Sequence, residues 1–360
     1  MSSSIFVLCQ NYPSEKDKYP MAFVHPRVKE YLKKGLDVKV ISFACHCSYT
    51  YDEVRVYTLE EGKELLQKSE KALLIAHAPN IKNHMFFILK VWKHINRLIL
   101  FFHGHEVLST KKYYPRPYHF NKSAKREYRF LRLYDQIKLP VMRHYLKKFV
   151  ASGKCDLVFV SNWMFEAALC SLKLKRKSFA DRSYIINNSI SPYIAEGGYN
   201  LNDFKADFVT IRPLDQSKYA IDLVVNFAKY HPESTFHIYG GGNYFNYNDI
   251  PANVTLINKF LSHQEIPFVL NSYKYALMPT RLDAQGVMMC EMAVFGMPTI
   301  VSDIAVCHEM LDSYPNVLFV DNNQFDCQLS DIPEPLSSPN FSFSVENTIH
   351  KEIELLQKYL

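Results

Sequence analysis

A chain of 360 residues is long enough for two domains of ordinary size, and a composition that is 48% hydrophobic and 14% aromatic excludes a disordered protein. No apolar run reaches the length of about 18 residues that a membrane-spanning helix needs, and the amino terminus lacks the basic region of a signal peptide. The net charge of +6 is unevenly divided, because residues 1–205 carry 34 Lys and Arg against 18 Asp and Glu, and residues 206–360 carry 8 against 18. This division suggests two domains with different partners, one of them anionic.

Short apolar segments alternate with helical patterns along the first half of the chain. This alternation is typical of βα units around a parallel sheet. A long helix is expected over about 122–152. The predicted strands of this half are 5–9, 37–43, 72–77, 98–103, 156–161 and 183–188.

The second half repeats the alternation and ends in an amphipathic helix at 346–360. Its predicted strands are 207–211, 235–240, 254–257, 275–279, 298–302 and 317–321. Residues 191–205 contain Pro, paired Gly and Asn, which indicates a linker. The sequence therefore predicts an α/β protein with two Rossmann-like domains, an N-terminal one at 1–190 and a C-terminal one at 206–345.

The stretch after the strand at 275–279 places two acids eight positions apart, Asp283 and Glu291, with Gly286 between them. In doubly wound sheets, ligands bind beyond the carboxyl ends of the strands, where helix amino termini can hold an anion or a sugar hydroxyl. Asp283 would face that site, and Glu291 could accept paired hydroxyls such as those of a ribose. The alternative is that Asp283 only caps the helix and Glu291 is a solvated helix residue.

This stretch resembles the donor-site signature of retaining GT-B glycosyltransferases of the large family 4-like, nucleotide-sugar-dependent group. The pattern P-S-x-x-E-x-F-G-x-x-x-x-E-A-x-A-x-G-x-P aligns without a gap from Pro279 to Pro298, and among its departures Asp283 replaces the first glutamate and Gln285 replaces the aromatic residue. The resemblance implies two domains facing each other across a cleft, with the C-terminal helix crossing back to the N-domain. It also implies donor contacts from Gln285, Gly286, Val287 and Glu291, with Asp283 orienting the transferred sugar.

Other segments resemble the same family in the same order. Arg212 and Lys218 stand where the family has an Arg and a Lys that hold the donor diphosphate, and two cations there would stabilise the leaving group without a metal. The glycines Gly240, Gly241 and Gly242 match the family's donor loop. In the N-terminal half, His103 is the candidate for the histidine that approaches the transferred sugar, with His105 as second choice, although the paired glycines of the family's first loop are missing.

Residues 122–150 carry nine Lys and Arg, two acids and interleaved aromatic residues. Such a face is expected to rest on anionic lipid and to present a glycan or polyprenyl-diphosphate-linked acceptor. A solvated helix face is the alternative, and nucleic acid is not expected as a partner because no nucleic-acid module accompanies the segment. The residues assigned to this membrane and acceptor face are Lys122, Lys125, Arg126, Arg129 and Arg132.

We therefore expect a cytoplasmic or peripheral membrane protein at the inner face of the cytoplasmic membrane. Its expected activity is that of a retaining, metal-independent glycosyltransferase, with a nucleotide sugar as co-substrate and no cofactor, in capsule, lipopolysaccharide or exopolysaccharide biosynthesis. Eight scattered cysteines are typical of reduced thiols, and Cys45 and Cys47 lack a second ligand pair for a metal. Two alternatives are a non-catalytic GT-B subunit that supports a partner enzyme and a GT-B nucleotide-sugar epimerase. An oxidoreductase would need a G-x-G-x-x-G after the first strand, which is missing.

Overall fold

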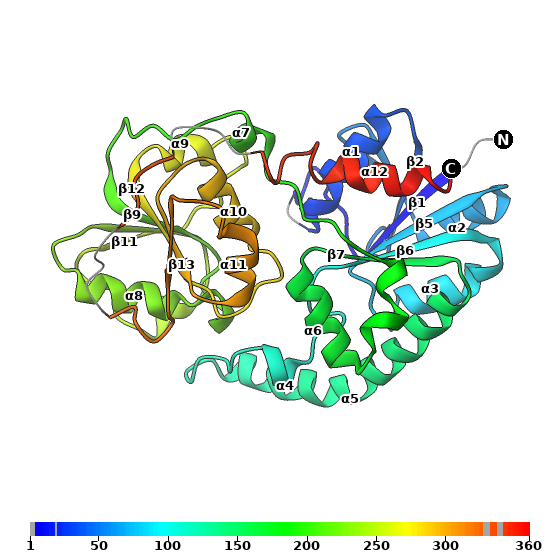
Figure 1. Cartoon of the computed structure of the whole chain (residues 1–360), viewed down its shortest axis with the longest axis horizontal. Helices are drawn as coiled ribbons and strands as arrows, with labels where there is room; N and C mark the ends of the chain where they lie inside the picture. The colour runs from blue at the N-terminus through cyan, green and yellow to red at the C-terminus, as the bar shows by residue number, and fades with distance from the viewer. Residues whose placement is uncertain (1–3, 19, 327–331, 337–340) are drawn as a thin grey trace. The chain divides into compact units, whose positions relative to one another are not determined.

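The computed structural model of the chain describes residues 4–18, 20–326, 332–336 and 341–360. It forms two compact units, shown in Figure 1, and each is described by itself. The first unit comprises Met1–Ser109, Tyr134–Asn188 and Thr348–Leu360, and the second comprises Thr110–Leu133 and Ser189–Asn347.

The first unit is built on an eight-stranded sheet in the order β3-β4-β2-β1-β5-β6-β7-β8. All neighbouring strands are parallel except β3 and β4, which form an antiparallel hairpin at one edge. The strands are β1 (Ser4–Cys9), β2 (Asp37–Ser42), β3 (Tyr49–Tyr51), β4 (Val54–Tyr57), β5 (Ala72–His77), β6 (Ile95–Phe102), β7 (Cys155–Phe159) and β8 (Ser183–Ile185). The six strands expected in this half are thus confirmed, and the short hairpin was not foreseen.

Helices cover both faces of this sheet, which explains why β1, β5 and β7 are buried along their whole length. Local sequence sets their ends; Thr58 and Glu61, for example, form a capping box at the start of α2. The helices are α1 (His25–Lys33), α2 (Leu59–Lys68), α3 (His84–Val91), α5 (Lys122–Ala151), α6 (Asn162–Leu172) and α12 (Ile349–Gln357), with α5 beginning in the second unit.

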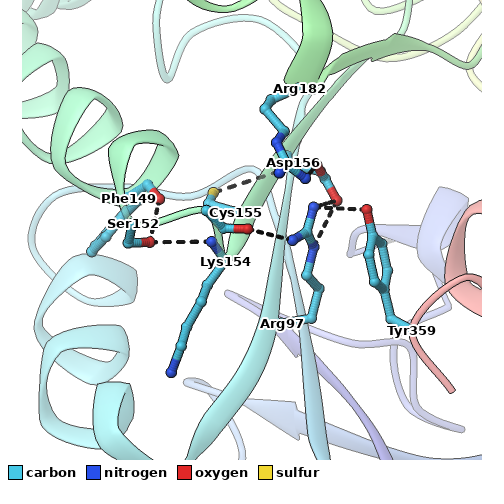
Figure 2. Close-up of polar contacts among 9 residues, drawn as sticks. Arg97, Phe149, Ser152, Lys154, Cys155, Asp156, Arg182 and Tyr359 are labelled. Atoms are coloured by element: carbon cyan, nitrogen blue, oxygen red, sulfur yellow. Dashed lines mark hydrogen bonds and ion pairs between the residues drawn. The ribbon is translucent and has the colours of Figure 1, made fainter.

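The C-terminal helix α12 packs on the first unit, as expected, and lies beside α1 in Figure 1. At one point the buried Arg27 guanidinium donates from Nε to Glu352 Oε2 at 3.0 Å. The second contact lies just beyond the end of α12, where the Arg97 guanidinium is 3.9 Å from the centroid of the Tyr359 ring. The same guanidinium also pairs with the buried Asp156 (Figure 2). These two contacts hold the last helix against a unit whose other residues lie more than 150 positions earlier.

The second unit contains a six-stranded parallel sheet in the order β11-β10-β9-β12-β13-β14. Its strands, each predicted from sequence to within two residues, are β9 (Ala206–Ile211), β10 (Phe236–Tyr239), β11 (Val254–Ile257), β12 (Tyr273–Met278), β13 (Thr299–Ser302) and β14 (Val317–Val320). Its helices are α4 (Thr110–Tyr113), α7 (Pro192–Ala195), α8 (Ile221–Tyr230), α9 (Ile266–Leu270), α10 (Val287–Val294) and α11 (Ala305–Leu311).

Two segments are placed differently from the sequence-based domain boundaries. Thr110–Leu133 groups with the second unit, because Tyr118 and Phe120 pack against its core beside α8. The segment expected as a linker holds the short helix α7, whose Ile194 is buried. The segment expected as a linker therefore contributes a buried side chain to the second unit.

Candidate functional site

The second unit has a cavity of about 280 Å³ at the carboxyl ends of three neighbouring strands, β9, β10 and β12, and at the start of α10. This is the edge at which ligands bind in doubly wound sheets. The lining is mainly apolar, and it includes two cations, one acid and three side chains with a hydroxyl group. The lining residues are Ile211, Arg212, Pro213, Tyr219, Tyr239, Gly240, Lys259, Phe260, Leu261, Ile266, Met278, Thr280, Asp283, Gly286, Val287, Met288 and Met289.

Glycines allow the loops at this edge to pack closely. Gly240 has φ of 137°, and a Cβ there would lie 2.0 Å from the carbonyl oxygen of Arg212. The same two loops are joined by a hydrogen bond from the Leu214 N–H to the Gly241 carbonyl at 3.0 Å. Gly240 therefore lines the cavity, whereas Gly241 and Gly242 contribute through loop packing and are not among the lining residues.

Arg212 follows β9 directly and brings a positive charge to the cavity. Its Nη1 donates to the carbonyl oxygens of Tyr219 and Pro279, while its buried Nε has no hydrogen-bond partner among the described residues. Burial lowers the pKa of Arg212 to about 10, and the nearby Asp283 carboxylate opposes that shift. The guanidinium is therefore charged at neutral pH, and protein acceptors do not use all of its N–H groups.

Asp283 lines the cavity from the loop after β12. Its Oδ1 accepts hydrogen bonds from the N–H groups of Ala284 at 2.8 Å and Gln285 at 3.3 Å. The residue at the N-cap of α10 is Gly286, with φ of 72° and no side-chain cap bond. Asp283 thus closes its own turn and does not cap the helix, which leaves its carboxylate at the cavity.

Three further expected residues do not line the cavity. Lys218 lies in a single 3-10 turn, Ser217–Tyr219, with its ammonium 4.7 Å from the centroid of the Tyr219 ring. Gln285 is buried, and so is Glu291, whose Oε1 accepts from the Ser191 N–H at 2.9 Å. Burial raises the pKa of Glu291 to about 7. Glu291 is therefore not the solvated helix residue of the alternative interpretation, and its contact with a ribose stays a prediction.

Sequence reasoning missed Lys259 and Phe260, which line the cavity just beyond β11. Lys259 pairs with Glu265 at 2.5 Å, and the Phe260 side chain is 59% exposed at the cavity. Both follow the carboxyl end of a predicted strand, where ligands bind in doubly wound sheets, so their position after the strand could have indicated them.

His103 lies in the first unit, one residue beyond β6. Its Nε2 is 3.3 Å from Nδ1 of the fully buried His77, and its ring lies 4.3 Å from that of Phe23. Burial lowers the pKa of His103 well below its usual range, with the Arg27 charge adding to the effect. His103 is therefore a neutral imidazole at the carboxyl end of its sheet.

The helix α5 carries the basic face that the sequence predicted. Lys122, Arg126, Arg129 and Arg132 are exposed, and Lys125 is half-buried. A row of large apolar side chains on the same helix is also exposed, Phe130 (64%), Leu133 (64%) and Ile137 (62%). Spacings of three and four residues place this row on one side of the helix.

The residues that the structure describes contain neither a cluster suited to a metal ion nor a helix suited to crossing a membrane. No group of three or more His, Cys, Asp or Glu side chains that could hold a metal ion occurs among them. Among the helices of the same residues, none combines the length and the hydrophobicity required to span a bilayer.

The comparisons with known proteins concern the fold. A scan against protein-family models and a search of the curated proteins both give no match. Solved structures do match: a glycosyltransferase from Rickettsia africae is 10% identical with a TM-score of 0.66, covering 99% of this chain and 98% of that one. The fold is GT-B.

Two further GT-B structures have the same arrangement over nearly the whole chain. Sucrose-phosphate synthase from Thermosynechococcus elongatus is 11% identical with a TM-score of 0.66, over 90% of this chain and 87% of that one. The Anabaena protein HepE, solved in complex with UDP and glucose, is 12% identical with a TM-score of 0.59, over 99% and 91%. The expectation of a GT-B fold is therefore confirmed.

Proposed function

We propose that the chain is a glycosyltransferase that takes a sugar from a nucleotide-sugar donor bound in the cavity of the second unit. The observation that carries the proposal is the meeting of Arg212 and Asp283 at a mainly apolar cavity beyond parallel strands. Arg212 offers a charged N–H donor to the diphosphate, and Asp283 offers an acceptor to the sugar hydroxyls. Phe260 and Leu261 offer apolar surface to the nucleobase and the ribose.

The GT-B neighbours support this choice of donor. HepE was solved with UDP and glucose, the two molecules that hydrolysis of UDP-glucose would release. We extend the same class of donor to this chain because its own cavity combines a cation, an acid and apolar walls. The nucleotide, the sugar and the acceptor are not specified by these contacts.

The proposed reaction is a retaining transfer that needs no metal ion. The bond between the sugar C1 and the diphosphate oxygen breaks, and the acceptor hydroxyl forms the new C1–O bond on the same face while its proton passes to the departing phosphate. Arg212, and Lys218 on the adjacent turn, stabilise the negative charge that develops on the leaving group. Asp283 orients the sugar, and His103 contributes a neutral hydrogen-bonding group.

The experiment has two stages. Thermal shifts of the full chain with UDP-, GDP- and dTDP-sugars in EDTA select the donor, and NMR of the product with a soluble glycan acceptor then gives the anomeric configuration. Retention without added metal is expected. Donor binding with no transfer to any acceptor would instead support a non-catalytic subunit, interconversion of the free nucleotide sugar would support an epimerase, and failure of every donor to bind would overturn the proposal.

We further propose that α5 holds the protein at an anionic membrane, where a polyprenyl-diphosphate-linked glycan would be the acceptor in capsule, lipopolysaccharide or exopolysaccharide assembly. The exposed Phe130, Leu133 and Ile137 add apolar surface to the basic residues that precede them. Basic residues close to such a surface contribute roughly 1 kcal/mol each, and apolar side chains add burial in the interface.

Sedimentation with vesicles tests this part separately. Neutralising Lys122, Lys125, Arg126, Arg129 and Arg132 to Gln should release the protein from anionic vesicles, as should added salt. The matched control changes five other exposed lysines to Gln, namely Lys16, Lys18, Lys68, Lys175 and Lys177. Equal loss of sedimentation in both variants would point to total charge and not to α5, and no binding by the wild type would remove the membrane from the proposal.

A further inference from the structure

The segment Tyr114–Asn121, which we call the strap, precedes α5 and belongs to the second unit. Two of its side chains, Tyr118 and Phe120, contact the core cluster that contains α8. The Tyr118 ring meets that of Tyr244 edge to face at 5.1 Å, and the Phe120 ring stacks on that of Tyr247 at 5.0 Å. These ring contacts fix the strap between α8 and the loop after β10.

The Tyr118 hydroxyl continues into an ionic contact. It donates to Asp222 Oδ1 at 2.8 Å, and Asp222 lies in the first turn of α8. Both oxygens of Asp222 also accept from Arg281, at 2.7 and 2.6 Å, which makes a bidentate pair. Burial, together with the Asp222 carboxylate, raises the pKa of Tyr118 above its usual range, so its hydroxyl stays a donor.

Arg281 joins two loops of the candidate site. Its Nη1 donates to the Ser217 carbonyl at 3.0 Å, and its backbone N–H donates to the Lys218 carbonyl at 2.8 Å. The neighbouring Thr280 hydroxyl donates to the same Lys218 carbonyl at 3.0 Å. These hydrogen bonds join the turn that carries Lys218 to the loop after β12. Thr280 and Asp283 of that loop line the cavity, so the turn is fixed to one of the cavity walls.

We propose that Tyr118 is a positioning residue for transfer: through Asp222 and Arg281 it fixes the turn of Lys218 against the loop of Asp283. This inference rests on the proposed function of the cavity. The side chains of Arg281 and Asp222 are each about a quarter exposed, at 26% and 28%. Water therefore competes for hydrogen bonds with both of them once the Tyr118 hydroxyl is removed. The strap hydroxyl is thus the contact that holds the carboxylate in the orientation that Arg281 needs.

Tyr118→Phe removes this hydroxyl and keeps the ring packing. Tyr247→Phe is the matched control, since Tyr247 belongs to the same ring cluster and its side chain is 62% exposed. In the full chain, with the donor selected by the thermal-shift screen, we expect Tyr118→Phe to lower kcat roughly three- to tenfold with the donor KM within twofold. Tyr247→Phe should leave both kinetic constants unchanged.

A double-mutant cycle with Asp222→Asn sharpens the test. If the hydroxyl acts through the carboxylate, Tyr118→Phe should have almost no further effect on kcat in the Asp222→Asn background. Additive effects, or a fall in melting temperature with kcat intact, would overturn the positioning role. An inactive wild type that binds no donor would contradict the proposed function instead, so the two failures are distinguishable.

Discussion

The carboxyl ends of the two parallel sheets differ in how their loops are filled. In the first unit, the loop after β1 has no glycine; its Tyr12 is buried and hydrogen-bonded to His25 at 2.8 Å. At the same edge of the sheet, Nδ1 of His77 lies 3.3 Å from Nε2 of His103. In the second unit, Gly240 and Gly286 stand at the corresponding edge, and a cavity of about 280 Å³ lies beside them.

The difference teaches where each part of the proposed reaction resides. Glycines allow backbone loops to pack closely without side chains that would fill the space. The glycine-containing edge of the second sheet also has the cation Arg212 and the acid Asp283, which suit a nucleotide-sugar donor. The first unit instead has polar side chains closely packed at this edge of its sheet. We assign the proposed donor binding to the second unit, and the following variants test this assignment by changing one unit at a time.

The largest effect is expected from Gly240→Ala. The added Cβ would lie 2.0 Å from the Arg212 carbonyl oxygen at a φ of 137°, so the loops after β9 and β10 must move apart. We expect a loss of stability on the order of 5 kcal/mol and no donor binding. Urea unfolding measures the stability. Gly241→Ala, whose nearest contact is the Asn258 side chain at 3.2 Å, is the control and should cost about 1 kcal/mol or less.

Glu352→Ala tests the first unit in the same way. It leaves the Arg27 guanidinium, 1% exposed, without its carboxylate partner. The expected cost is about 3–5 kcal/mol at pH 8, where Glu352 is ionised because burial raises its pKa only to about 7. The double variant Arg27→Met with Glu352→Met should recover much of that loss. If donor affinity falls with the stability of this helix contact, donor binding is not confined to the second unit.

Glu291→Gln is expected to have a smaller and pH-dependent effect. Burial raises the pKa of Glu291 from 4.5 to about 7, so ionisation of this carboxyl favours the unfolded chain. That cost is absent below about pH 4.5, grows as the pH rises, and is complete above pH 7. Gln keeps an acceptor for the Ser191 N–H, so the variant should be more stable than the wild type at pH 8 by up to about 3 kcal/mol.

Most of that difference should disappear at pH 5. A stability difference that is the same at pH 5 and pH 8 would show that Glu291 is not buried as a neutral acid. Donor affinity measured in parallel reports on the predicted ribose contact, because Gln weakens a bond that needs a carboxylate.

Much of the fold was predictable because apolar segments of parallel strands are buried on both faces and stand out in sequence. Of the donor residues, Arg212, Asp283 and Gly240 line the cavity because each directly follows a strand or lies in the loop that it begins. Lys218 was placed by the family resemblance, and Glu291 by its spacing from Asp283 and the same resemblance. Such patterns do not tell which way a side chain faces, and neither residue lines the cavity. The packing of Tyr118 on α8 joins residues 104 positions apart, and no local pattern predicts such a contact.

The most direct test is the binding of UDP, GDP and dTDP to the full chain by titration calorimetry in EDTA. Arg212→Ala removes one of the two cations that line the cavity, and Met288→Trp fills the cavity without removing a polar group. His103→Ala changes the first unit only. We expect one nucleotide to bind the wild type and His103→Ala equally, Arg212→Ala to bind it roughly 10- to 100-fold more weakly, and Met288→Trp not to bind it. Equal binding by all four proteins, or no nucleotide bound by the wild type, would contradict the assignment of the donor site to the second unit.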